Sequence, residues 1–176
     1  MQPEQPETGL VPVLPSSDEA SRQIALGVLS DLPKGGGVNS VIRALPSLPA
    51  AIQTGVIETL VARGETAAKA AIIAVAEGKD VTVRPVAIEA IGSLGDVADV
   101  PRLMKLATIG SEAERQAART ALARLEGADV DAVITAKLRS ATPEERLELM
   151  GVLKARHATS SAALLAEFLN DPNPAT

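Results

Sequence analysis

The chain has 176 residues, the size of one compact domain or of a short array of repeats. It carries 17 Lys and Arg against 22 Asp and Glu, a net charge of −5, which makes it a poor non-specific ligand for nucleic acid or for an anionic membrane. It has no Cys and a single His, which excludes disulfides, thiolate metal sites and multi-histidine metal sites.

The first 17 residues differ in composition from the rest of the chain. They contain four prolines and no basic residue, and no stretch of the sequence reaches the 18 apolar residues of a membrane span. The segment also lacks the basic start and long apolar core of a secretory signal. We therefore expect residues 1–17 to be a flexible, Pro-rich extension, and we take the chain as cytoplasmic by default.

A period of 31 residues runs through the remainder of the sequence. Two columns of apolar residues follow this step, namely Leu29, Leu60, Ile91, Leu122 and Leu153, and Val41, Ile72, Leu103, Ile134 and Leu165. The period defines an array over 18–172 with five copies, at 18–48, 49–79, 80–110, 111–141 and 142–172. Residues 173–176 repeat the opening of a copy, so we expect the chain to be a segment of a longer array or a truncated product. The alternative is that these residues are only a helix stop.

Each copy reads as a helix–turn–helix. In the third copy the apolar residues of the first helix recur at steps of three and four, at Val83, Val86, Ala87, Ala90, Ile91 and Leu94. Gly95 and Asp96 break this pattern, and a second apolar stripe begins at Val100. Gly64 stands at the same break in the second copy. The sequence therefore predicts an all-α fold.

Helix start signals recur with the same period. The predicted N-cap column is Asp18, Pro49, Asp80, Ser111, Thr142 and Asn173. Ser111 with Glu114 and Thr142 with Glu145 have the spacing of capping boxes. Pro49 has no side-chain acceptor, so the first turn of the second copy is expected to be irregular.

The third and fourth copies resemble HEAT repeats of the short bacterial type, which also occur in the bilin-lyase HEAT-like family. The resemblance is carried by Val83–Asp96 (VRPVAIEAIGSLGD), by the Val100, Pro101 and Leu103 that follow, and by Glu114–Leu125 (ERQAARTALARL). It extends over about residues 18–172. It implies a right-handed α-solenoid, an armadillo-like α-α superhelix with first helices on the convex side and second helices on the concave side. Such solenoids mostly bind proteins.

One arginine column follows the period of the fold, at Arg22, Arg84, Arg115 and Arg146. A ladder of ligand-binding arginines is one interpretation. We favour a structural column, in which each guanidinium bonds carbonyls or an acidic residue of the adjacent repeat while its stem covers apolar surface.

The outward face of the second helices is the candidate partner-binding surface. Its residues are Arg43, Ala71, Ala74, Arg102, Lys105, Val133, Ala136, Arg139, Leu164 and Glu167. Small side chains let a partner approach the backbone closely, which predicts a shallow protein-binding groove. The alternative is an ordinary solvated helix face.

No catalytic, cofactor-binding or metal-binding set is predicted. His157 falls at a turn without a nucleophile arrangement around it, and Gly35–Gly37 lacks the context of a phosphate loop. The acidic pairs lie in the first turns of first helices, where the helix dipole favours them. We therefore expect a chain that is not an enzyme and needs no cofactor.

These observations predict a protein–protein interaction scaffold, a module of a larger bacterial protein. Self-association through the uncapped last copy is a further expectation, because Leu164, Leu165 and Phe168 make its outer face apolar. Two alternatives are a bilin-lyase-like enzyme or chaperone and a nucleic-acid-binding HEAT-like protein. Both are expected to use aromatic side chains, and the chain has one Phe with no Tyr or Trp.

Overall fold

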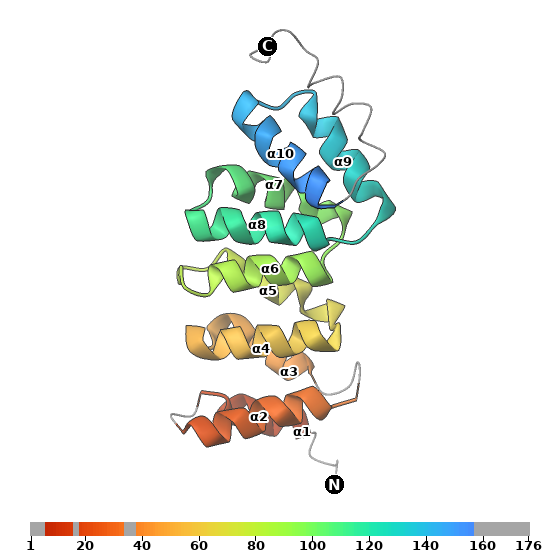
Figure 1. Cartoon of the computed structure of the whole chain (residues 1–176). Coiled ribbons are helices and arrows are strands. Elements are labelled where there is room, and N and C mark those ends of the chain that lie inside the picture. The colour runs from red at the N-terminus through yellow and green to blue at the C-terminus, as the bar shows by residue number, and fades with distance from the viewer. Residues whose placement is uncertain (1–5, 16–17, 34–37, 157–176) are drawn as a thin grey trace. The chain divides into compact units, whose positions relative to one another are not determined.

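A computed structural model describes residues 6–15, 18–33 and 38–156 (Figure 1). Within these residues the fold is all-helical, with ten α-helices, three short 3-10 helices and no strand. The chain divides into two compact units, Met1–Leu94 and Gly95–Thr176. The division falls in the turn between the two helices of the third predicted copy.

The first unit is a stack of short antiparallel helix pairs. Its helices are α1 (Pro6–Val13), α2 (Glu19–Asp31), α3 (Asn39–Ala44) with a 3-10 turn at Leu45–Ser47, α4 (Ala50–Arg63), a 3-10 turn at Thr66–Ala68, α5 (Lys69–Ala76) and α6 (Arg84–Leu94). Helix α4 packs against α2 and α6, and α5 packs against α6. The predicted column residues Leu29, Leu60 and Ile91 are all buried at these contacts. The 31-residue period therefore marks the core of this unit.

The amino-terminal segment differs from the expected flexible extension. Helix α1 lies within it and packs against α2 and α3. Leu10 and Leu14, one helical turn apart, are buried there. The four prolines directed the prediction toward an extension, but this pair supplies enough apolar surface to dock a short helix.

The second unit begins with a 3-10 turn and contains four described α-helices. Its elements are the turn Val97–Asp99, α7 (Val100–Ile109), α8 (Glu112–Arg124), α9 (Ala128–Leu138) and α10 (Pro143–Ala155). Helix α8 packs against α7 and α10, and α10 also contacts α7 and α9. The core again follows the period, since Leu103, Leu122, Ile134 and Leu153 are buried.

Three of the predicted helix caps are confirmed. Asp18 accepts the Ser21 amide at 2.9 Å, and this bond together with the one from the Ser21 hydroxyl holds the pKa of the Asp18 carboxyl below its usual range. Ser111 and Thr142 both form complete capping boxes. These side chains satisfy amides that a helix start leaves without an intrahelical partner.

Two other predicted starts behave differently. The carboxylate of Asp80 accepts the amide and hydroxyl of Thr82, at 2.9 and 2.6 Å, and therefore closes a turn rather than capping a helix. Helix α6 begins later, at Arg84. This start leaves Pro85 in the first turn, where its missing N–H costs little, whereas an earlier start would place it in the helix interior. Pro49 offers no side-chain cap, and its carbonyl accepts the amides of both Ile52 and Gln53.

A buried arginine outside the predicted column ties two neighbouring first helices together in the first unit. Arg63, at the end of α4, donates to the carbonyls of Ser30 at 2.8 Å, Leu32 at 2.6 Å and Pro33 at 3.2 Å. It also pairs with the buried carboxylate of Glu65 at 2.8 Å. These carbonyls lie at the end of α2, where a helix leaves acceptors without intrahelical donors.

The second unit repeats this arrangement. Arg156, which directly follows α10, donates to the carbonyls of Leu122 at 2.7 Å and Leu125 at 2.6 Å, with a longer bond to Ala123. It also pairs with Asp131. The guanidinium thus donates to carbonyls at the end of α8, the preceding first helix, where a helix leaves its last carbonyls without intrahelical donors.

Candidate functional site

The predicted partner-binding residues fall on both units. Arg43, Ala71 and Ala74 lie in the first unit and Arg102, Lys105, Val133, Ala136 and Arg139 in the second, while Leu164 and Glu167 lie outside the described residues. Of these, Arg43, Ala74, Lys105, Ala136 and Arg139 are exposed, and Ala71, Arg102 and Val133 are half-buried. The described residues of this face are therefore at least partly accessible in each unit.

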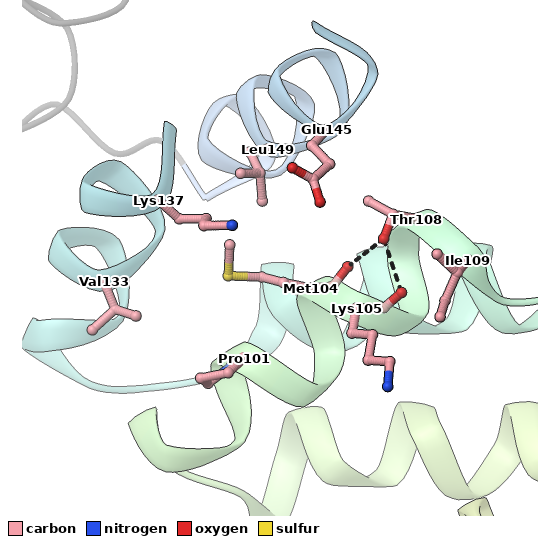
Figure 2. Close-up of a pocket in the computed structure, with 9 residues that line it drawn as sticks. All are labelled: Pro101, Met104, Lys105, Thr108, Ile109, Val133, Lys137, Glu145 and Leu149. Carbon is pink, nitrogen blue, oxygen red and sulfur yellow. Dashed lines mark hydrogen bonds between the residues drawn. The ribbon is translucent and has the colours of Figure 1, made fainter. Parts of the chain in front are cut away.

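A hollow with a volume of about 510 Å³ opens in the second unit, among α7, α9 and α10. Figure 2 shows its nine lining residues: Pro101, Met104, Lys105, Thr108, Ile109, Val133, Lys137, Glu145 and Leu149. We call it the α7–α9–α10 groove. It includes Lys105 and Val133 from the predicted face, Lys137 from the basic surface around that face, and residues of α10 that do not belong to it.

The floor and walls of the groove are mainly apolar. Met104 and Leu149 are almost fully buried beneath it, whereas the Ile109 side chain is 70% exposed at its edge. Thr108 donates its hydroxyl to the carbonyls of Met104 and Lys105, at 3.4 and 3.0 Å, as the dashed lines in Figure 2 show. The Thr108 hydroxyl therefore has its hydrogen-bond partners within α7 and needs none from a ligand bound in the groove.

Three charged side chains border the groove. Lys105 comes from α7 and Lys137 from α9, and both are exposed. Neither forms an ion pair with any carboxylate in the described part of the chain. Glu145, from the first turn of α10, already accepts the Thr142 amide at 3.0 Å as part of a capping box.

A second hollow, of about 460 Å³, adjoins the groove and shares Thr108, Ile109 and Glu145 with it. Two of its charged side chains, Arg119 and Glu148, pair with each other. Arg119 binds Glu148 through two bonds, one of them at 2.8 Å, and this pairing raises the pKa of the Arg119 guanidinium. The bidentate geometry uses the donors and acceptors of both side chains for structure. The α7–α9–α10 groove is therefore the better candidate for binding an apolar ligand.

The predicted arginine column makes local contacts with the end of the preceding second helix. Arg115 donates to the Gly110 carbonyl at 3.0 Å, and Arg146 donates to the Leu138 carbonyl at 3.3 Å. Both carbonyls belong to residues at the end of the preceding repeat's second helix. Bonds from a guanidinium to backbone carbonyls are the contacts expected of a structural column.

The remaining members of the column are more varied. Arg22 pairs with Glu19 within α2, and Arg84 is half-buried in the first turn of α6. Gln53 takes the place of arginine in the second copy and donates to the Leu45 carbonyl at 3.0 Å. The Gln53 amide thus makes the same bond that Arg146 makes in the fifth copy, to the carbonyl eight residues earlier.

No catalytic constellation emerges from the described residues. In residues 6–15, 18–33 and 38–156, no cluster of three or more acidic or histidine side chains could hold a metal ion. The helices described in those same ranges are too short or too polar to cross a bilayer. His157 and Gly35–Gly37 lie outside the described residues.

The arrangement of paired, periodic helices defines an all-α repeat protein of the α-solenoid class. Residues 38–123 match the family model for HEAT repeats. This match spans slightly less than half of the chain and supports the resemblance to HEAT repeats that the sequence indicated. No curated protein matches it. HEAT repeats commonly form protein-interaction scaffolds and are typically non-enzymatic.

Proposed function

We propose that this chain is a non-catalytic scaffold module that binds a protein partner through the α7–α9–α10 groove. The observation that carries the proposal is the groove itself, an apolar hollow of about 510 Å³ on the second-helix side of the second unit. Its volume falls within the range of sites that accept ligand side chains or small molecules.

The chemistry of the lining supports a protein ligand. Ile109 is 70% exposed at the edge, and an exposed apolar side chain beside a hollow is a feature of interaction sites. The border is polar and charged while the floor is apolar, which is the usual anatomy of a protein interface. None of the described residues that line the groove is aromatic and could stack on a base or a tetrapyrrole, so this lining favours neither alternative function.

Site-specific photo-crosslinking tests this function. A benzoylphenylalanine side chain is placed at Lys137, inside the groove, in the full chain, and the protein is irradiated in a lysate of its source. We expect a discrete protein adduct, identified by mass spectrometry. A matched variant carries the same group at Lys154, an exposed lysine of α10 outside the groove, and should not form that adduct.

The mass of the adduct separates the outcomes. An adduct with a second protein supports the scaffold function, and an adduct at twice the mass of the chain shows self-association through the groove. Equal labelling from both positions, or no protein adduct at Lys137, contradicts the proposal.

A further inference from the structure

We propose that the α7–α9–α10 groove recognises an acidic peptide segment, in which one large apolar side chain is flanked by carboxylates. This inference rests on the proposed scaffold function and adds the chemistry of the partner. It depends on two separate features of the groove, its apolar floor and the charge of its border.

The floor is suited to one large aliphatic or aromatic side chain. Pro101, Met104, Val133 and Leu149 supply apolar surface from three helices. Met104 is unbranched and adapts its shape to an inserted group. A Phe or Leu side chain placed over this floor buries its apolar surface without leaving an unsatisfied polar group, because Thr108 is hydrogen-bonded within α7.

The two border side chains that form no ion pair in the described ranges, Lys105 and Lys137, are both positively charged. Lys105 and Lys137 have no carboxylate partner in the described ranges, although the chain as a whole has a net charge of −5. In the same unit, by contrast, Arg119 and Arg156 are held by Glu148 and Asp131. The two lysines are thus free to meet carboxylates from a ligand.

The negative charge of Glu145 determines where the acidic residues of the peptide can lie in the groove. Its carboxylate stands at the α10 end of the groove, and in Figure 2 it comes down from α10 toward Thr108, whereas Lys137 reaches out from α9. Like charges placed together are unfavourable. The acidic residues of the ligand therefore belong beside α7 and α9, with the apolar side chain inserted between them.

Fluorescence anisotropy with three labelled ten-residue peptides tests the inference on the full chain. The first carries a central Phe between Asp and Glu residues, the second replaces Phe by Ala, and the third replaces each acidic residue by Lys. We expect saturable binding of the first peptide only. Its affinity should fall as salt is raised, because the charges involved lie at an exposed border.

Groove variants locate the binding. Lys105→Ala and Lys137→Ala should each weaken the first peptide by about two- to fivefold, the size of an exposed ion pair. Lys154→Ala removes the same charge outside the groove and should leave the affinity unchanged.

A tryptophan at the edge of the groove gives a second readout. Because the chain contains no Trp or Tyr, Ile109→Trp adds a single fluorescent reporter there. Its emission should shift to shorter wavelength when the first peptide binds.

The results separate this inference from the proposed function. Equal binding of the acidic and basic peptides, or an equal loss in Lys154→Ala, overturns the inference. If the Lys137 crosslink forms but no acidic peptide binds, the groove is an interface whose partner has another chemistry. If neither is observed, both the proposed function and the inference are wrong.

Discussion

Arg63 and Arg156 occupy the same position of the 31-residue period, three copies apart, and both donate to backbone carbonyls at the end of the preceding first helix. In each case the guanidinium donates to the carbonyl one period earlier, at Leu32 or Leu125. The sequence did not reveal this role, because the copies between them carry Leu94 and Leu125 at that position. This position of the period therefore looks apolar. Only the distance between the two arginines, three whole periods, could have indicated that they share a role.

Replacing Arg63 should be costly. Its side chain and that of Glu65 are 6% and 8% exposed, so Arg63→Leu leaves a buried carboxylate and several carbonyls of α2 without a donor. We expect a loss of about 3–5 kcal/mol in the free energy of unfolding. Urea denaturation followed by circular dichroism measures this change.

A double-mutant cycle identifies the source of the loss. Arg63→Leu combined with Glu65→Gln should recover part of the stability, because no charge is then buried without a partner. Arg43→Leu, at an exposed position, is the matched control and should have little effect. A cost below about 1 kcal/mol for Arg63→Leu would show that the buried bonds contribute no more than a surface pair.

At the scale of the element, the sequence best predicted the features whose interacting residues all lie within one helical turn. Ser111 and Thr142 form their capping boxes because all partners lie within three residues. Asp80 did not cap α6, since Pro85 requires a later start. The groove was only partly predicted, because its lining comes from three helices, and Leu149 at helical spacing looks like any other core residue.

The capping box at the start of α8 provides a test at this scale. Ser111→Ala removes the acceptor of the Glu114 amide, and we expect it to destabilise the chain by about 0.5–2 kcal/mol. Ser111→Asn should retain most of the stability, because it offers an equivalent acceptor. Ser47→Ala, at an exposed position of a 3-10 turn, serves as the control.

Amide hydrogen exchange gives the readout for α8. Faster exchange in its first turn should accompany the loss in Ser111→Ala, while the last turn remains protected. If Ser111→Ala and Ser47→Ala have the same effect on both stability and exchange, the capping box contributes nothing measurable.

For the whole molecule, the period predicted the class of fold because each copy contributes the same buried positions. Leu60 and Leu122 stand at one position of the period and are both fully buried, each in its own unit. The period could not locate the division between Leu94 and Gly95, since that division falls inside a predicted copy. The predicted array also began too late to include α1, although Leu10 of this helix stands 31 residues before Val41, in the second apolar column.

These two leucines test how locally the fold is stabilised. Leu60→Ala and Leu122→Ala each leave a cavity in a packed core, and we expect each to cost about 2–5 kcal/mol. In a repeat protein stability is approximately a sum of neighbouring contacts, so each loss should stay near its origin. Peptide-resolved hydrogen exchange should show faster exchange in α2–α6 for Leu60→Ala and in α8–α10 for Leu122→Ala.

Lys105→Ala, at an exposed position, is the control for both leucine variants and should leave exchange in both regions unchanged. Equal acceleration across the whole described chain by either leucine variant would mean that the two units unfold as one cooperative body, against the additive behaviour argued from the repeat.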